Sequence, residues 1–320
     1  MAATNQKWFP PTGDSSNQDL HIVLIGKTGA GKSATGNTLI GENILESRGG
    51  YEGVTRNCLV KEFKRFGTKL VLVDTPGFCD IKSPKEWLAE QLVSCTCLAY
   101  PGVHIFLLVL KVGERYSPED QNALESIKEM FGENFVKHTI VVFTCKDTLE
   151  ADGLDFQSEK LKLPNGMQEI IKSCKGGNIV ISNRATADVR EQEAERIIFQ
   201  MKKVVQQNGG GSKYYRTALF DKIAEEIEKR INQIMKGNAK IEKKIKLLQN
   251  EMDLLTREDQ HEQRRKLEKD IEALKKDIVG KGPAQAEAVQ ETRTQMLKRV
   301  AGYAAPVCIA GIITICRLLK

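Results

Sequence analysis

The sequence predicts an α/β fold in which a mainly parallel sheet is covered by helices on both faces and followed by long charged helices. Between His21 and Ile181, short apolar runs alternate with longer segments rich in Lys, Glu and Leu. The runs are continuously apolar, as is typical of strands buried on both faces of a parallel sheet. A glycine-rich stretch at 208–212 separates this block from a region of interleaved charges, which indicates a domain boundary.

The strands and helices of the first block are predicted in alternation. The strands are the runs HIVLIG, KLVLVD, HIFLLVL, TIVVFT and NIVIS. The helices begin at Lys32 and then cover about Lys85–Leu98, Pro118–Phe131, Phe156–Lys172 and Val189–Gln206.

The composition excludes several classes of protein. Of the 320 residues, 41% are hydrophobic and 28% are charged, values typical of a folded protein and not of a disordered or polytopic membrane protein. The net charge of +6 is spread along the chain, so we expect no nucleic-acid partner. The eight cysteines have no disulfide-framework spacing, and Cys95 and Cys97 have no His cluster near them, so we expect reduced thiols and no zinc site.

The expected organisation has six parts. A flexible arm at 1–19 carries no apolar segment of a signal peptide. The others are a globular domain at 20–207, a linker at 208–217, a charged helical region at 218–280, a polar linker at 281–299 and a hydrophobic tail at 300–320.

The charged region has the apolar spacing of paired helices. Ile241, Ile245, Leu248, Met252 and Leu255 step by three and four residues, and a second stripe follows from 267 to 278. A polar interruption between the stripes favours a helical hairpin that folds back on the globular domain, and the sustained spacing favours an intermolecular coiled coil. The sequence leaves both open.

The tail has the length and flanks of a membrane anchor. Residues 300–316 are apolar apart from Thr314 and have basic residues on both sides. A helix of about 17 to 20 residues spans about 25 to 30 Å, enough to cross a bilayer. We therefore expect residues 300–319 to hold the protein on the cytosolic face of an intracellular membrane, with an amphipathic or buried terminal helix containing Pro306 as the alternative.

A phosphate-binding loop follows the first predicted strand. The residues from Gly26 to Ser33 read GKTGAGKS and fill the pattern GxxxxGK[ST] between a strand and a helix. Glycines let backbone N–H groups approach phosphates, Lys32 is expected to reach the β and γ phosphates, and the Ser33 hydroxyl is expected to bind Mg²⁺. The predicted phosphate site comprises Gly26, Lys27, Thr28, Gly29, Ala30, Gly31, Lys32, Ser33 and Ala34.

The next two nucleotide motifs also follow buried strands. Asp74 ends the run KLVLVD and is expected to hold Mg²⁺ through water, while the N–H of Gly77 is expected to contact the γ-phosphate. Asp147 follows TIVVFT, and a carboxylate there accepts hydrogen bonds from N1–H and N2–H₂ of guanine, which adenine does not offer. These motifs favour GTP and GDP as ligands.

The chain resembles the GTPase of immunity-associated protein (GIMAP) family, which is related to the septin and chloroplast-import GTPases. The resemblance covers about 20–206, and the stretch from Pro101 to Asp120 is the most family-specific part. The matching segments are GKTGAGKSATGNTLIG, GVT at 53–55, LVDTPGFCD, PGVHIFLLVLKVGERYSPED, FTCKD and SNRAT. The resemblance implies a P-loop GTPase domain over 20–207 that associates through its G domain with itself or with related GTPases, often on membranes in immune settings.

The resemblance also implies roles for individual residues. Thr55 becomes the residue that contacts Mg²⁺ and the γ-phosphate, and Ser47 a hydroxyl near the nucleotide. Asp147 and Asn183 are implied to frame the guanine, and Thr144 to shape its pocket. The family commonly has Arg where this chain has Cys145, and the short Cys145 side chain does not cover the base. Lys146 and Arg184 are the residues that could replace that cover.

The sequence predicts slow hydrolysis. Phe78 stands after Gly77, where small signalling GTPases have the Gln that positions water. Arg115 follows a predicted strand on the nucleotide side, and it is either an arginine finger donated across a dimer or a solvated loop residue.

The predicted function is a Mg²⁺-dependent guanine-nucleotide switch that dimerises in the GTP state. A nucleotide-locked scaffold that acts through its helices, with negligible turnover, remains an alternative because of Cys145 and Phe78. An ATP-using kinase or transporter-type enzyme is the third reading, which a preference for ATP over GTP would favour.

Overall fold

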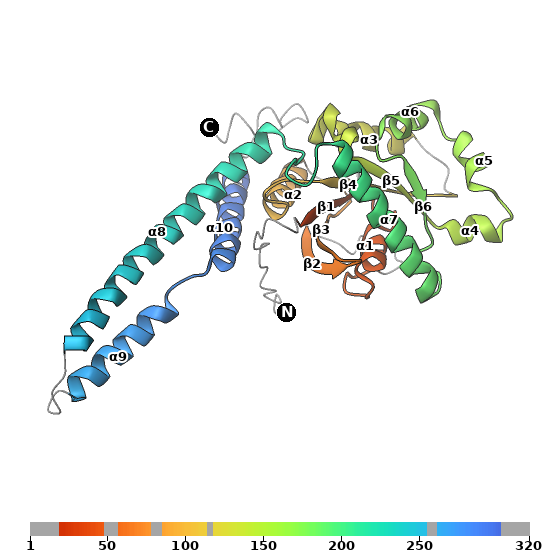
Figure 1. Cartoon of the computed structure of the whole chain (residues 1–320). Helices are drawn as coiled ribbons and strands as arrows, with labels where there is room; N and C mark the ends of the chain where they lie inside the picture. Colours follow the sequence, from red (N-terminus) through yellow and green to blue (C-terminus); the bar gives the residue numbers. More distant parts are fainter. Residues whose placement is uncertain (1–18, 48–56, 78–84, 114–117, 255–260, 302–320) are drawn as a thin grey trace. The chain divides into compact units, whose positions relative to one another are not determined.

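The computed structural model of the chain describes residues 19–47, 57–77, 85–113, 118–254 and 261–301 (Figure 1). The described residues form two compact units. The first consists of 19–223 with 293–301, and the second of 224–292.

The first unit is built on a six-stranded sheet with the strand order β2-β3-β1-β4-β5-β6 (Figure 1). Its strands are β1 (Leu20–Ile25), β2 (Leu59–Arg65), β3 (Thr68–Asp74), β4 (Ile105–Lys111), β5 (Thr139–Thr144) and β6 (Asn178–Val180). All strand pairs are parallel except β2 with β3, which are antiparallel. The predicted mainly parallel α/β sheet is therefore confirmed.

Strand β2 is a strand that the sequence patterns did not indicate. It forms one edge of the sheet, and its residues LVKEFKR are exposed or half-buried. Because an edge strand that faces solvent carries charges between its apolar residues, it lacks the continuous apolar run of the central strands.

Most helices of the first unit lie close to their predicted positions, but the 3₁₀ turn at Glu133–His138 and the short helix at Lys146–Ala151 were not predicted. They are α1 (Lys32–Ile40), α2 (Lys85–Leu98), α3 (Pro118–Phe131), a 3₁₀ turn η1 (Glu133–His138), α4 (Lys146–Ala151), α5 (Phe156–Leu161), α6 (Asn165–Ser173) and α7 (Ala187–Gln207). The single helix expected over Phe156–Lys172 is wrong, because the chain forms α5 and α6 with Pro164 as the N-cap of α6. The residue before a proline disfavours the helical backbone, which explains the break at Leu163.

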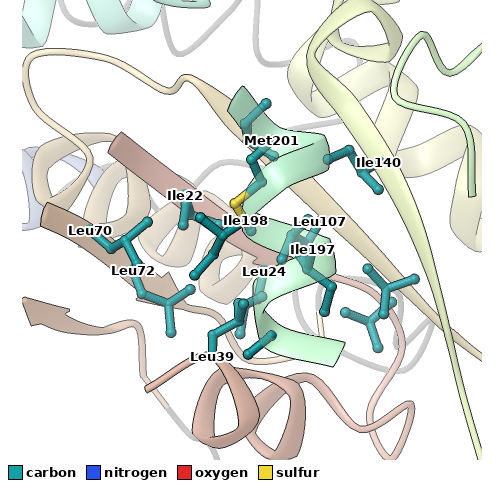
Figure 2. Close-up of a cluster of buried hydrophobic side chains, with 14 of the residues drawn as sticks. Ile22, Leu24, Leu39, Leu70, Leu72, Leu107, Ile140, Ile197, Ile198 and Met201 are labelled. Atoms are coloured by element: carbon teal, nitrogen blue, oxygen red, sulfur yellow. The ribbon is translucent and has the colours of Figure 1, made fainter. Parts of the chain in front are cut away.

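Alternate residues of the central strands supply the two layers of core. Helices α1 and α7 cover one face, where Leu24, Leu39 and Ile198 belong to one buried cluster (Figure 2). On the other face, Phe106 of β4 packs against Phe131 of α3, with ring centroids 5.0 Å apart. Burial on both faces leaves the ends of the strands as the places where polar loops gather.

The compact units divide inside helix α8 (Ala218–Leu254) and not at the glycine-rich stretch. Leu219, Phe220 and Ile223 in the first turns of α8 are buried, and the Phe220 ring lies 6.3 Å from that of Tyr215. Tyr215 in turn exchanges backbone hydrogen bonds with Val103 just before β4. The start of α8 is thus part of the globular unit.

The second unit is a helical hairpin. Helix α8 pairs with the segment that contains α9 (His261–Lys276) and the start of α10 (Lys281–Ala301) (Figure 1). The Asn238 amide accepts a hydrogen bond from the Val279 N–H and donates one to the Val279 carbonyl, and Arg230 pairs with Glu291. The a/d positions Ile245 and Ile271 are buried, so the predicted apolar stripes are used within one chain. An intermolecular coiled coil stays a prediction.

Helix α10 differs from the sequence expectation of a polar linker at 281–299. Pro283 lies in its first turn, where N–H groups have no partner within the helix and a proline costs no hydrogen bond. Ala284, Ala288 and Val289 are buried on one side of the helix. Small apolar residues at this spacing form only a narrow stripe, which does not stand out from the surrounding polar sequence. No helix among the described residues combines the length and apolar character needed to span a membrane. Most of the predicted tail, 302–320, lies outside those residues.

Candidate functional site

The loops that follow β1, β3, β5 and β6 lie together on the side of the sheet where these strands end. The strands are parallel, so their carboxyl ends lie together there. Side-chain hydrogen bonds join the loops: Ser33 to Asp74, Thr144 to Ala30 and Asn183 to Thr38. The predicted phosphate and base residues are therefore neighbours in space.

The loop after β1 has the backbone of a phosphate cradle. Gly26, Gly29 and Gly31 have φ values of 148°, 78° and 96°, a region that residues with a side chain rarely adopt. Gly31 is the N-cap of α1, whose cap makes no side-chain hydrogen bond and whose first turn has no acidic residue. An anion is therefore favoured at the start of α1, because the positive end of the helix dipole lies there and no acidic side chain in the first turn opposes it.

Lys32 places a buried positive charge inside this loop. The residue is only 6% exposed, and Nζ donates hydrogen bonds to the carbonyl oxygens of Gly26, at 3.1 Å, and Lys27, at 2.9 Å. Removing an ammonium group from water is costly unless it is hydrogen-bonded, and these bonds offset part of that cost. The loop is held closed around a cation that favours phosphate oxygens.

Ser33 and Asp74 form a pair of hard oxygen donors. The Ser33 hydroxyl donates to Asp74 Oδ2 at 2.6 Å, and Asp74 is 1% exposed. The next residue, Thr75, donates to the Leu24 carbonyl at 2.6 Å, which fixes the end of β3 against β1. A hydroxyl beside a carboxylate is a donor set that suits Mg²⁺.

Gly77 lies against the phosphate loop. A Cβ atom at this position would be 2.1 Å from Thr28 Oγ1 and 2.6 Å from the Thr28 backbone nitrogen, so only glycine fits. The close approach brings the backbone of the loop after β3 beside the loop after β1. Four of the residues expected in a magnesium–nucleotide complex therefore lie together in this structure, namely Lys32, Ser33, Asp74 and Gly77. Within the described residues, no group of three or more His, Cys, Asp or Glu side chains forms a separate metal site.

On the base side, the loop after β5 is tied to the phosphate loop. The Thr144 hydroxyl donates to the Ala30 carbonyl at 2.8 Å. Cys145 has a left-handed backbone with φ 64°, which turns the chain sharply from β5 into α4. This turn sets the direction of Lys146 and Asp147 at the start of α4.

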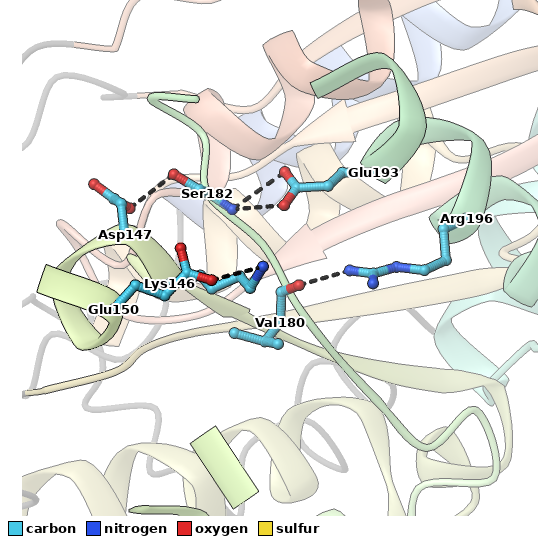
Figure 3. Close-up of polar contacts among 7 residues, drawn as sticks. All are labelled: Lys146, Asp147, Glu150, Val180, Ser182, Glu193 and Arg196. Carbon is cyan, nitrogen blue, oxygen red and sulfur yellow. Dashed lines mark hydrogen bonds and ion pairs between the residues drawn. The ribbon is translucent and has the colours of Figure 1, made fainter. Parts of the chain in front are cut away.

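Asp147 belongs to a chain of polar contacts (Figure 3). The Ser182 hydroxyl donates to Asp147 Oδ1 at 2.8 Å, and both carboxylate oxygens of Glu193 accept from the Ser182 N–H at 3.1 Å. Lys146 pairs with Glu150 at 2.9 Å, on the surface of α4. Arg184, the other residue expected to cover a base, is exposed.

Asn183 is braced against α1. Its Oδ1 accepts a hydrogen bond from the Thr38 hydroxyl at 2.9 Å, and its Nδ2 donates to Thr35 Oγ1 at 3.2 Å. The sequence implied contact with guanine and did not indicate these threonines. Their spacing of three residues on a helix is the signal that could have found them, since it places both hydroxyls on one face.

The structure gives the positions of only some of the remaining predicted residues. Ser47 accepts a hydrogen bond of 3.4 Å from the Asn37 amide, which also holds the backbone at Leu45. Ala34 lies in the first turn of α1. Thr55, Phe78 and Arg115 lie outside the described residues.

The strand order, the glycine-rich loop, the buried Lys32 and the Ser33–Asp74 pair together define a P-loop domain of the GTPase class. Comparison with known proteins narrows this class. The chain belongs to the AIG1 family, which matches residues 20–236. The family resemblance inferred from the sequence motifs is thus confirmed.

Two curated relatives from Arabidopsis thaliana show the similarity. Immune-associated nucleotide-binding protein 7 is 32% identical over 225 residues, covering 68% of this chain and 70% of the relative. Immune-associated nucleotide-binding protein 9 is 33% identical over 246 residues, covering 75% of this chain and 69% of the relative.

Among solved structures, Toc33 from Arabidopsis thaliana in complex with Mg²⁺ and GMPPNP is 16% identical, with a TM-score of 0.47, covering 60% of this chain and 86% of Toc33. Toc33 with GDP and Mg²⁺ is 18% identical, with a TM-score of 0.42, covering 59% of this chain and 86% of Toc33. Likenesses of this size carry no inference about the ligands of this chain.

Proposed function

We propose that this chain is a guanine-nucleotide switch that binds GTP and GDP with Mg²⁺. One observation carries the proposal. The closed glycine loop around Lys32, the Ser33–Asp74 pair and Asp147 all lie at the carboxyl ends of the parallel strands. Membership in a family whose relatives are named as nucleotide-binding proteins supports it.

Each part of the site has a separate task. The N–H groups of the loop and of the first turn of α1 bind phosphate oxygens, and Lys32 neutralises their charge. Ser33 and Asp74 hold Mg²⁺, which neutralises the β and γ phosphates when it is bound. Asp147 accepts from the two guanine donors, with Thr144 forming the wall between base and phosphates. The N–H of Gly77 contacts the γ-phosphate and so distinguishes GTP from GDP.

The further parts of the proposal rest on the family resemblance for Thr55 and for the association of G domains, and on the sequence for Arg115 and the tail. Thr55 contacts Mg²⁺ and the γ-phosphate in the GTP state, two G domains then associate, and Arg115 of one acts on the nucleotide of the other to give slow hydrolysis. The tail at 300–319 holds the protein on the cytosolic face of an intracellular membrane. GTP turnover per molecule that rises with protein concentration, and loses this rise in Arg115→Ala, is the expected result. A flat dependence in both proteins would contradict the dimer mechanism.

Nucleotide binding is tested by calorimetric titration of the full chain with GDP, a non-hydrolysable GTP analogue and ATP in magnesium buffer. We expect binding of both guanine nucleotides and at least about 100-fold weaker binding of ATP. Lys32→Ala should weaken GDP binding by about 10- to 100-fold, because a charge-assisted hydrogen bond to phosphate is lost. Lys172→Ala, which removes an exposed lysine of α6, is the matched control and should bind normally.

Two results would overturn the proposal. One is a folded wild-type protein that gives no heat with either guanine nucleotide, and the other is equal binding of ATP and GDP. Removal of Mg²⁺ with EDTA adds a check on the metal site: it should weaken binding of the GTP analogue in the wild type and have less effect in Ser33→Ala.

A scaffold that stays locked to its nucleotide is the second proposed function. It is favoured by the helical hairpin at 224–292, which exposes Met235, Leu247 and Leu254 for contact with another protein. Single-turnover measurement with labelled GTP separates the two proposals, since the scaffold keeps GTP unhydrolysed at every protein concentration.

A further inference from the structure

Glu193 is a buried carboxylate that the phosphate and magnesium chemistry does not use. It lies on α7 with only 6% of its surface exposed, beside the fully buried residues Ala194 and Ile197. Burial of a carboxylate is costly unless hydrogen bonds compensate for the lost water. Here both carboxylate oxygens accept from one donor, the Ser182 N–H, at 3.1 Å each.

This donor needs a partner because of its place in the sheet. β6 is an edge strand of three residues, and beyond it the Ile181 N–H still pairs with Phe143 of β5. Successive N–H groups along a strand point to opposite sides, so the Ser182 N–H points away from β5. Two side chains of α7 complete the open edge: Glu193 accepts from the Ser182 N–H, and Arg196 donates to the Val180 carbonyl at 2.7 Å (Figure 3).

The contact continues from Ser182 to Asp147. The Ser182 hydroxyl donates to Asp147 Oδ1 at 2.8 Å, so it fixes the rotation of the carboxylate that is proposed to meet guanine. A carboxylate has about four lone-pair positions, and this bond occupies one of them. Oδ2 and the second position on Oδ1 remain for the two donors of the base.

We propose that Glu193 is a positioning residue for guanine recognition, which holds Ser182 so that the Ser182 hydroxyl aims Asp147 at the base. This inference rests on the proposed function, because it gives Asp147 its role. It adds a residue of α7 that touches neither nucleotide nor metal. A charged group on the covering helix thereby sets the selectivity of a loop on the sheet.

The test compares GDP with IDP, whose base lacks the exocyclic amino group. The two ligands have the same ribose and diphosphate, so the ratio of their dissociation constants reports only how well Asp147 meets that amino group. Calorimetry on the full chain gives both constants. If Glu193 contributed only to stability, its substitution would lower the amount of folded protein and leave this ratio unchanged.

We expect Glu193→Ala to lower the preference for GDP over IDP by about 5- to 10-fold, part of the effect of losing a charged hydrogen bond. Glu193→Gln keeps one acceptor oxygen for the Ser182 N–H, so its preference should fall by only about 2- to 3-fold. Glu195→Gln is the matched control, since Glu195 lies on the same helix and is exposed. It should keep the wild-type ratio.

A double-mutant cycle with Ser182→Ala tests the route of the effect. Ser182→Ala should lower the ratio by itself, and Glu193→Ala should add little in that background, because the hydroxyl through which it acts is gone. If Glu193→Ala does not fold, Glu193→Gln replaces it in the cycle.

Two outcomes would overturn the proposal: a wild-type ratio in the Glu193 variants, or an undiminished effect of Glu193 in the Ser182→Ala background. A wild-type protein that binds neither GDP nor IDP is a different result, and it refutes the proposed function itself.

Discussion

Gly26→Ala is the substitution whose cost follows most directly from the structure. Gly26 begins the phosphate loop with φ 148°, a backbone conformation adopted almost only by glycine. A Cβ atom there would lie 2.4 Å from the Val109 carbonyl oxygen, about 1 Å closer than ordinary van der Waals contact. Val109 cannot move away easily, because it lies in β4 between β1 and β5 and pairs with Val142.

Two terms make up the expected loss of stability. The strained backbone costs about 1–3 kcal/mol, and forced overlap in a packed region costs about 1–3 kcal/mol more. Gly29→Ala is the matched control in the same loop. Gly29 has φ 78°, but no heavy atom of the described residues lies within 4 Å of its Cβ position, so only the left-handed backbone cost of about 1–2 kcal/mol applies.

The assay is urea unfolding of the nucleotide-free full chain, followed by circular dichroism. We expect Gly26→Ala to lower the free energy of unfolding by about 2–6 kcal/mol, clearly more than Gly29→Ala, out of a typical total of about 5–15 kcal/mol. If the two variants unfold at the same urea concentration, the contact with Val109 does not govern the loop and the reasoning is refuted.

Three further predictions concern the core, the base loop and pH. Ile198→Ala should cost about 2–5 kcal/mol in urea unfolding, because Ile198 is 1% exposed in the cluster under α7 and its truncation leaves a cavity. Cys145→Val should be about 1–2 kcal/mol less stable than Cys145→Asn, since a β-branched residue disfavours φ 64° and Asn tolerates it; equal stability would contradict this. Burial lowers the pKa of His21 to about 3 and that of His104 to about 4, so both are neutral in the folded protein. Below about pH 6.5 these histidines bind protons in the unfolded chain but not in the folded protein. The free energy of unfolding should therefore fall by about 1.4 kcal/mol per pH unit for each histidine, down to about pH 4. Urea unfolding at a series of pH values measures this slope, and His104→Gln should reduce it.

The sequence contained most of the fold because its strongest signals are local. Continuous apolar runs marked the buried strands, and α2 and α3 have the predicted bounds Lys85–Leu98 and Pro118–Phe131. β2 carries charges between its apolar residues, and α10 has small residues instead of an apolar run, so neither has a periodic pattern that separates it from surface sequence.

Some parts of the candidate site could likewise be predicted from the sequence, and others could not. The loop from Gly26 to Ser33 could be predicted because its eight residues are contiguous and each has a defined task. The contacts of Asn183 with Thr35 and Thr38 join residues 148 and 145 positions apart, so they depend on the packing of α1 beside the end of β6. Glu193 is one of several charged residues on α7, and its burial is visible only once the helix lies on the sheet.

The two outer strands of the sheet also bear on solubility. β2 has four charged side chains among its seven residues, and β6 has only three residues with Glu193 and Arg196 bonded beyond it. Neither edge offers a long, apolar template to which a strand of another molecule could be added, a common start of aggregation. Any specific pairing of two such domains is therefore expected to depend on side chains and loops, and extension of the sheet from one copy into the next is disfavoured.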